Sequence, residues 1–502
     1  MTRTAGRLAR TRPLDLPGPL GRRGRRTRSA LRRAVWRLGR WAAGVAQRGG
    51  DLAIAALLVS VGAPLFAGLA ARALHRRGRL FDRTTLIGRH RRPFDRLAFA
   101  GGGRGAALAV LFNVVRGDLA LVGPRALPAA EAAALPVAAQ VRFDVRPGLF
   151  SPYGLRRRAG VAYDAEHAVD REFVLAQSTA GDLGVLARAL PAALLGAGAA
   201  RPAPERLCVF GVTMANTTMD EALDWISARA ADGRPSLAAF VNPDCLNIAY
   251  RSADYRAALA GADQVWPDGI GLRLAGRLLG WSLRANVNGT DLFPRLCARC
   301  AATGQSLFLF GARPGVAAAA AEAMRVAHPG LRIAGVRDGY HAAGEEEGVV
   351  AAINASGADI LLVALGAPRQ ELWLAAQHQR LRPAVRIGVG GLFDYYSGRI
   401  PRAPQWMREI GLEWVWRMAQ EPGRLWRRYL IGNPLFLWRV WRQRRSAAGG
   451  PVSPPVAGRG TGSVTPGDSS GRRANPSALD VNPDSDPQAV ACRGMSPAKR
   501  VD

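Results

Sequence analysis

Between residues 206 and 433, short apolar runs alternate with longer stretches of helical periodicity. The apolar runs include Leu207–Val212, Leu237–Val241, Leu307–Phe310, Ile360–Leu365 and Val385–Val389. The helical stretches include Met219–Ala228, Val316–Ala327 and Glu371–Gln379. Strands that alternate with helices are typical of βαβ units. The pattern therefore predicts an α/β domain with a Rossmann-like parallel sheet in the C-terminal half.

The N-terminal half contains a different pattern, a run of twenty residues without a charge from Leu52 to Ala71. This is the length that spans a bilayer. Pro64 interrupts the run beyond its middle, and basic residues flank both ends. A spanning helix prefers positive charge on one side, so the flanks favour a helix that re-enters the same leaflet. A transmembrane helix and a buried helix of a soluble protein stay open as alternatives. We expect an α-rich, membrane-associated domain here.

Composition divides the 502-residue chain into four parts. Residues 1–50 are rich in Arg and are predicted to be mostly disordered. Residues 51–200 form the predicted membrane domain. Residues 206–433 form the α/β domain, with a basic, Trp-rich appendage to about residue 445. Residues 447–502 are rich in Gly, Pro, Ser and Asp and are predicted to be a disordered tail.

The formal net charge of the chain is +31, and it is unevenly distributed. Residues 1–50 carry fourteen Arg against one Asp, and residues 401–446 carry ten Arg against three Glu. Such charge attracts polyanions, of which nucleic acid, anionic lipid and phosphorylated substrates are the candidates. Because the charge lies beside the apolar run and the Trp-rich appendage, it favours a membrane surface.

One string in the N-terminal half is specific enough to suggest a family. Residues 113–125 read NVVRGDLALVGPR, and VRPGLFSP follows from Val145. These strings resemble the bacterial sugar transferases that load a sugar phosphate onto polyprenyl phosphate, a family with a re-entrant membrane helix. That family carries an Asp-Glu pair where this chain has Ala106 and Ala107. A methyl group can neither attack phosphorus nor hold Mg²⁺, so we expect a catalytically dead membrane platform.

Four strings occur in order in the C-terminal half. The first is FVNPDCL from Phe240, and the second is ADQVWPDGIG from Ala262, which NGTD follows from Asn288. The third is LGAPRQE from Leu365. The fourth is GVGGLFD from Gly388, which is followed by RAP from Arg402 and by Glu413-Trp414. Together they resemble the WecG/TagA/CpsF glycosyltransferases (glycosyltransferase family 26). The resemblance implies a hexosyltransferase that uses a UDP-sugar.

Asp268 is the candidate catalytic residue. It follows an apolar run at the predicted carboxyl end of a strand, where parallel α/β sheets bind ligands. A carboxylate there suits a general base, although an ordinary Asp-Gly turn is the alternative. By resemblance, the corresponding Asp is the proposed base of the family. The resemblance also implies substrate-binding positions, namely Asn242, Asn286 (where the family often has Arg), Gln370, Glu371 and Asp394.

Three arginines are candidate diphosphate ligands. Arg417, Arg424 and Arg427 are spaced by seven and three residues, which would place them near one face of a helix. By resemblance, an Arg trio of this kind grips the diphosphate. We expect no metal and no other cofactor, so these cations would neutralise the departing UDP. Six of the twelve Trp residues lie between 402 and 445, and Trp mixed with Arg is typical of a membrane interface.

The sequence thus predicts an inverting glycosyltransferase at the cytoplasmic face of the bacterial inner membrane. Its expected partners are a UDP-sugar, a polyprenyl-diphosphate-linked acceptor, anionic lipid and other polysaccharide-assembly enzymes, without nucleic acid. The product would enter an exopolysaccharide or another surface glycan. Two alternatives are a bifunctional enzyme with an active phosphosugar transferase half and a basic nucleic-acid-binding protein.

Overall fold

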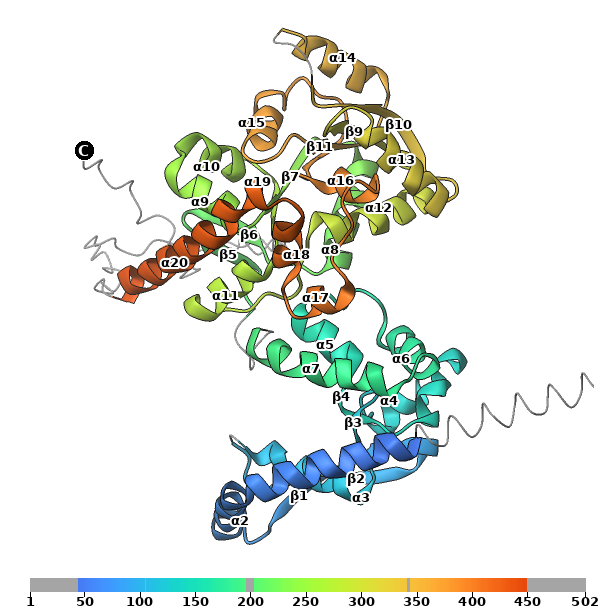
Figure 1. Ribbon diagram of the computed structural model, residues 1–502. Coiled ribbons are helices and arrows are strands. Elements are labelled where there is room, and N and C mark those ends of the chain that lie inside the picture. The colour runs from blue at the N-terminus through green and yellow to red at the C-terminus, as the bar shows by residue number, and fades with distance from the viewer. Residues whose placement is uncertain (1–43, 104, 196–202, 341–343, 449–502) are drawn as a thin grey trace, which may run out of the picture. The chain divides into compact units, whose positions relative to one another are not determined.

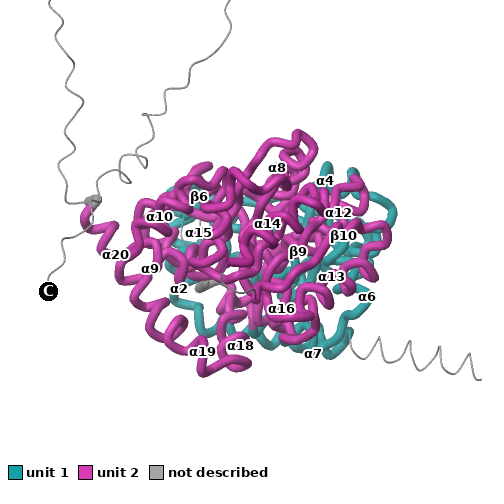
Figure 2. The backbone as a smooth tube through the Cα atoms, turned by 90° about the horizontal axis from the view of Figure 1, so that it is seen from above, with its two compact units in different colours: residues 1–153, 165–187 teal, residues 154–164, 188–502 magenta. Residues whose placement is uncertain are grey.

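The computed structural model describes residues 44–448 except for 104, 196–202 and 341–343 (Figure 1). The predictions made for residues 1–43 and 449–502 lie outside this part of the chain. The chain forms two compact units, which Figure 2 colours separately. The first comprises residues 1–153 and 165–187, and the second comprises residues 154–164 and 188–502.

The described part of the first unit begins with two consecutive apolar helices. One occupies residues 44–61, and α2 (Ala63–Arg77) follows after a turn at Gly62. The break is therefore where Pro64 predicts it. Residues 44–61 are the one described helix that is long and apolar enough to cross a membrane, and only 11% of this segment is buried.

The rest of the first unit mixes short strands with helices. The antiparallel pair is β1 (Phe81–Ile87) with β2 (Pro93–Phe99), and the parallel pair is β3 (Ala120–Val122) with β4 (Gly148–Phe150). Its helices are η1 (Arg89–Arg91), η2 (Ala106–Ala109), α3 (Val110–Arg116), α4 (Ala129–Ala133), η3 (Val137–Asp144) and α6 (Glu166–Leu175). Helices α5 (Pro152–Ala159) and α7 (Thr179–Leu195) each continue into the second unit.

Asn113, the first residue of the NVVRGDLALVGPR string, holds together elements of the first unit. Asn113 is fully buried, its Oδ1 accepts a hydrogen bond from the Leu97 amide at 2.9 Å, and its Nδ2 donates to the Asp95 carbonyl at 2.7 Å. The same Nδ2 donates to the carboxylate of Asp118 at 3.0 Å. These contacts join α3 to β2, so a structural role accounts for this part of the motif.

The second unit contains the predicted parallel sheet. Its strands are β7 (Ser236–Val241), β8 (Gln264–Pro267), β9 (Ser306–Gly311), β10 (Arg332–Arg337), β11 (Ile360–Ala364) and β12 (Val385–Gly388). They lie in the order β10-β9-β11-β12-β7-β8, and every neighbouring pair is parallel. The expectation of a parallel α/β sheet is confirmed. Strand β8 is the run whose predicted carboxyl end precedes Asp268, whereas β10 was not among the predicted runs.

One predicted strand is instead a hairpin. Residues 207–212 contribute to β5 (Arg206–Val209) and β6 (Val212–Ala215), which pair antiparallel. Phe210 and Gly211 form the turn with φ of 54° and 81°. Both residues adopt the left-handed conformation that a two-residue hairpin turn requires, so the chain reverses in the middle of the apolar run.

Helices flank the sheet of the second unit (Figure 1). They are α8 (Met219–Asp232), α9 (Pro243–Arg251), α10 (Ala253–Ala260), α11 (Ile270–Leu279), α12 (Gly289–Thr303), α13 (Val316–Ala327), α14 (Glu346–Ala355), α15 (Arg369–Ala376) and α16 (Leu392–Tyr396). The helices predicted over 219–228 and 316–327 are confirmed. The third begins two residues before the predicted Glu371.

The appendage after residue 404 is a broken series of helices. It consists of α17 (Gln405–Glu409), α18 (Glu413–Gln420), α19 (Pro422–Trp426), the π-helix η4 (Arg427–Gly432) and α20 (Asn433–Ala448). Glu421 has φ −130° and ψ 60°, which ends α18. The prediction that Arg417, Arg424 and Arg427 share one helical face assumed a continuous helix, and it is wrong. Phe436 and Val440 of α20 are fully buried in the core cluster around β5 and β6.

Candidate active site

Asn242 and Asp268 follow two neighbouring parallel strands. Strands β7 and β8 pair in the register Val241 to Pro267, and the Asp268 amide donates to the Val241 carbonyl at 2.8 Å. The two candidate residues therefore leave the same edge of the sheet side by side. Gly271 makes this approach possible, since a Cβ there would lie 2.3 Å from Cγ of Pro243.

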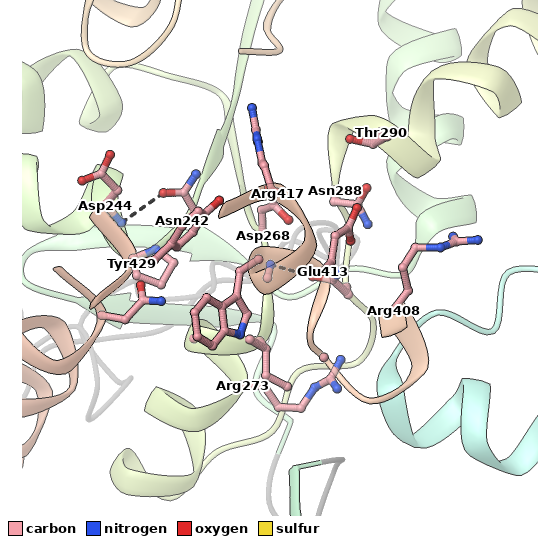
Figure 3. A pocket seen from close by; sticks show the side chains of 18 of the residues that line it. Asn242, Asp244, Asp268, Arg273, Asn288, Thr290, Arg408, Glu413, Arg417 and Tyr429 are labelled. Carbon is pink, nitrogen blue, oxygen red and sulfur yellow. Dashed lines mark hydrogen bonds between the residues drawn. The ribbon is translucent and has the colours of Figure 1, made fainter. Parts of the chain in front are cut away.

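A pocket opens at this edge of the sheet (Figure 3). Its carboxylate and amide side chains are Asn242, Asp244, Asp268, Asn286, Asn288, Glu413 and Asn433. Its arginines are Arg273, Arg408, Arg417 and Arg428, and its aromatic side chains are Tyr395, Trp414 and Tyr429. The sheet edge supplies Asp244 and Asp268, and the appendage supplies Glu413 and most of the arginines and aromatic rings. This combination can bind a phosphorylated, ring-containing ligand.

The environment of Asp268 brings the pKa of its carboxyl group close to neutral pH. Burial, together with the nearby Glu413, raises the pKa of Asp268 to about 7, against the opposing effect of Arg417 and Arg428. A general base is most effective when its pKa lies near the working pH. The carboxylate can therefore accept a proton from a hydroxyl placed in the pocket.

Asp291 forms ion pairs with two arginines, Arg402 and Arg408. Its buried carboxylate pairs with Arg402 at 2.5 Å and with Arg408 at 3.4 Å. Asn288 caps α12 by accepting the Asp291 amide at 2.8 Å, and its Nδ2 donates to the Asp291 carboxylate. The buried ion pairs fix Arg408 where it lines the pocket.

Two arginines of the appendage lie next to Asp268. The guanidinium of Arg417 lies 5.4 Å from the ring centroid of Tyr395, and its Nε has no hydrogen-bond partner among the described residues. Arg428 pairs with Asp244 at 3.3 Å. A half-buried guanidinium with an unused donor is suited to bind an anionic ligand.

Arg424 and Arg427 lie outside the pocket. Arg424 pairs with Glu421 and is largely exposed, and the exposed Arg427 stacks on Trp426 at 5.3 Å from its ring centroid. The break at Glu421 and the wider turn of the π-helix rotate them away from Arg417, and Arg428 takes the inward position. Direct diphosphate binding by Arg424 and Arg427 stays a prediction.

Asn242 and Asn286 line the pocket and also fix its backbone. Asn242 caps α9, since its Oδ1 accepts the amides of Asp244 at 3.0 Å and Cys245 at 3.2 Å. Oδ1 of Asn286 accepts the Gly269 amide at 2.8 Å. Both asparagines therefore hold the loops on which the candidate base depends.

The remaining predicted residues are not among those that line the pocket. Oε1 of Gln370 accepts the amides of Gly366 at 3.1 Å and Gly390 at 2.9 Å, which joins the loops after β11 and β12. Its Nε2 donates to buried Glu371 at 2.7 Å, and burial raises the pKa of Glu371 to about 7. Asp394 pairs with Arg399 at 2.7 Å. Substrate contact by these three residues stays a prediction.

Several pocket residues were not predicted from the sequence. Asp244 and Glu413 lie inside the recognised strings and could have been selected as carboxylates. Arg408, Ala159 and Val161 carry no local signal, because they reach the pocket only through tertiary packing. The described residues contain no group of three or more His, Cys, Asp or Glu placed to hold a metal ion.

Comparison with known proteins assigns both halves of the chain. The model of the glycosyl transferase WecG/TagA/CpsF family matches residues 207–449, and the bacterial sugar transferase model matches residues 107–196. The chain is 35% identical to an N-acetylglucosaminyldiphosphoundecaprenol N-acetyl-beta-D-mannosaminyltransferase of Bacillus spizizenii, over 41% of this chain and 79% of the relative. It is 30% identical to a Bacillus subtilis protein of the same name, over 47% of this chain and 92% of the relative.

The pocket at the sheet edge thus belongs to a glycosyltransferase. The chain is a member of the WecG/TagA/CpsF family, and its N-terminal half is related to the bacterial sugar transferases. Both predicted resemblances are confirmed.

Proposed function

We propose that the protein transfers a sugar from a UDP-sugar to a saccharide carried on polyprenyl diphosphate, with inversion at the anomeric carbon. The Bacillus relatives are named for transfer of an N-acetylmannosaminyl group to N-acetylglucosaminyl-diphosphoundecaprenol. We extend this class of acceptor to the present chain. The product enters exopolysaccharide or another surface glycan.

Asp268 carries the chemistry in this proposal. Its carboxylate removes the proton from the acceptor hydroxyl while the hydroxyl oxygen attacks the anomeric carbon. The bond between that carbon and the UDP oxygen breaks, and UDP leaves with the bonding electrons. The observation that carries the proposal is a carboxyl group with a pKa of about 7 at the carboxyl end of a parallel sheet, next to unused arginine donors.

Arginines stabilise the leaving group in place of a metal. Arg417 and Arg428 flank Asp268, and Arg408 lies on the Glu413 side of the same pocket. Preorganised cations that face developing charge lower the barrier of such a step. The exposed Arg424 and Arg427 are placed to meet anionic groups at the protein surface. The proposal requires no metal and no other cofactor.

The protein works at a membrane, on its cytoplasmic face, where UDP-sugars are made. The apolar helix of residues 44–61 and the exposed aromatic side chains of the appendage support this, among them Trp426, Trp438 and Trp441. Trp and Arg together are typical of membrane interfaces. Other polysaccharide-assembly enzymes are the expected neighbours. Flotation with anionic liposomes, and no mobility shift with DNA, separates this proposal from a nucleic-acid-binding function.

The test of the proposed function is a panel of UDP-sugars offered with a polyprenyl-diphosphate-linked N-acetylglucosamine acceptor. Mass spectrometry then measures the extended lipid-linked product. UDP-N-acetylmannosamine is the first donor to try, given the names of the relatives. A failure of every donor, with folded protein and intact acceptor, contradicts the proposal.

A further inference from the structure

Residues 154–164 belong to the second structural unit, although the bacterial sugar transferase model matches them. They comprise most of α5 and the extended segment after it. Ala159 and Val161 of this segment line the glycosyltransferase pocket. A segment that matches the bacterial sugar transferase model therefore forms part of the pocket of the glycosyltransferase half.

Hydrogen bonds hold this segment against the loop that precedes α12. The Asn286 amide donates to the Gly160 carbonyl at 3.2 Å. The hydroxyl of Tyr163 donates to the Asn286 carbonyl at 2.7 Å and accepts from Nδ2 of Asn288 at 3.1 Å. Asn286 is thus fixed on both sides of its backbone by residues of the segment.

The buried Arg273 fixes the other side of the segment. Its guanidinium donates to the carbonyls of Arg158, at 3.3 Å, and Ala159. Arg273 itself lines the pocket. The segment is therefore bound to three pocket residues that are far from it in the sequence, Arg273, Asn286 and Asn288.

Gly160 is required for this close approach. Its φ is +67°, and a Cβ there would lie 2.5 Å from Nη2 of Arg273 and 3.2 Å from the backbone nitrogen of Asn286. A side chain would have to displace the backbone of Asn286 or break the contact of Arg273. A substitution at Gly160 therefore disturbs Asn286 directly.

Asn286 passes this constraint to the candidate base. Its Oδ1 accepts the amide of Gly269, the residue that follows Asp268. The contacts run from Gly160 and Tyr163 to Asn286, and from Asn286 to the Asp268 loop. Because each of these contacts is a direct hydrogen bond, a shift of Gly160 or Tyr163 moves Asn286 and with it the Gly269 amide.

We infer that Gly160 and Tyr163 are positioning residues of the glycosyltransferase site, which hold the Asp268 loop through Asn286. The inference rests on the proposed function of Asp268. It gives the sugar-transferase-like sequence a role besides the proposed membrane attachment, because part of that sequence completes the pocket of the WecG/TagA/CpsF-like half of the same chain.

The test compares Gly160→Ala with Gly233→Ala in the full chain. Gly233 has nearly the same φ, +64°, but a Cβ there meets nothing within 4 Å, so this control carries the backbone strain without the clash. The first readout is hydrogen exchange of the Gly269 amide. We expect it to exchange about tenfold faster in Gly160→Ala than in Gly233→Ala, the loss expected for one weakened hydrogen bond.

The second readout is the kinetic profile of the same pair. We expect kcat of Gly160→Ala to fall about 10- to 100-fold, the usual effect of a misplaced catalytic group. Water that enters a loosened loop also weakens the burial of Asp268, so the acid limb of the pH profile moves to lower pH. The neighbouring charged groups Glu413, Asp291, Arg417 and Arg428 are unchanged in this variant. A purely structural role would lower stability without moving the pH profile.

Tyr163→Phe provides the same test if Gly160→Ala does not fold, since it removes the hydroxyl contacts and keeps the ring. Exchange at Gly269 and a pH profile equal to those of the control would overturn the inference. Faster exchange in a protein whose wild type transfers no sugar would leave the positioning contacts standing and contradict the proposed function instead.

Discussion

The side-chain oxygen of Asn286 accepts the backbone amide of Gly269 at 2.8 Å, so the residue after Asp268 is held by a side chain from another loop. An arginine, which the WecG/TagA/CpsF resemblance leads one to expect at this position, has no acceptor atom and could not make this contact. In this chain, residue 286 therefore serves the backbone of the pocket as well as its lining.

Replacement of Asn286 tests which of these two roles dominates. Asn286→Ala leaves the Gly269 amide without its acceptor, which costs about 1–3 kcal/mol for a buried donor. We expect a lower melting temperature and a kcat reduced about tenfold or more, with a smaller change in the donor KM. Thermal unfolding and steady-state kinetics measure both effects. A raised KM with unchanged kcat and melting temperature would mean that Asn286 chiefly binds substrate.

The raised pKa of Asp268 predicts the pH dependence of activity. A base works in its ionised form, so kcat/KM should fall as the pH drops below about 7. This acid limb of the pH profile should disappear in Asp268→Asn, because an amide at position 268 does not titrate and the residual activity no longer depends on that group. A wild-type acid limb near pH 4, the ordinary range of a carboxyl, would contradict the proposed environment.

The same pKa predicts an effect on stability with a definite sign. The folded state holds the Asp268 proton up to about pH 7, whereas the unfolded chain releases it near 3.8. The stability that this carboxyl contributes is therefore present below about pH 4 and is lost as the pH rises through about 7. Asp268→Asn should unfold at a higher temperature than the wild type at pH 8, and this advantage should shrink at pH 4.

Arg417 and Arg424 form a matched pair of arginines inside and outside the pocket. Arg417→Ala should reduce turnover about 10- to 150-fold, because it removes a charge-assisted contact of about 1.5–3 kcal/mol to the diphosphate. Arg424→Ala should reduce it much less, since Arg424 is exposed and paired with Glu421. The assay uses a short-chain acceptor in detergent without anionic lipid, which excludes an effect on membrane docking. Equal losses in both variants would show that Arg424 also reaches the diphosphate.

Ala106 and Ala107 predict that the N-terminal half transfers no phosphosugar. The Asp268→Asn chain is the suitable protein for this test, because transfer by its C-terminal half is expected to be about 10²-fold slower. Incubation with UDP-sugars and polyprenyl phosphate should release no UMP and leave no covalent phosphosugar adduct. Release of UMP above the level of a protein-free control would favour the bifunctional alternative.

Local sequence was sufficient to predict the sheet and the position of Asp268 at its carboxyl edge. The runs at 237–241, 307–310, 360–365 and 385–389 are strands because continuous apolar residues suit a sheet that is covered on both faces. Asp268 was identified because it follows such a run, and the carboxyl ends of parallel strands share one edge.

The arginine positions and the pocket wall could not be obtained in this way. The spacing of Arg417, Arg424 and Arg427 indicates one face only if the helix is continuous, and Glu421 and the π-helix interrupt it. The position of Gly160 depends on contacts with Arg273 and Asn286, more than a hundred residues away. No local pattern encodes contacts of that range.

The most direct test of the central claim is the rate of lipid-linked product formation by wild type and Asp268→Asn. The acceptor is polyprenyl-diphosphate-linked N-acetylglucosamine, the donor is the most active UDP-sugar of the panel, and circular dichroism confirms that the variant is folded. The account predicts that Asp268→Asn forms product about 10²-fold more slowly or worse, the usual scale for loss of a general base. Product formation by the variant at the wild-type rate would contradict the account.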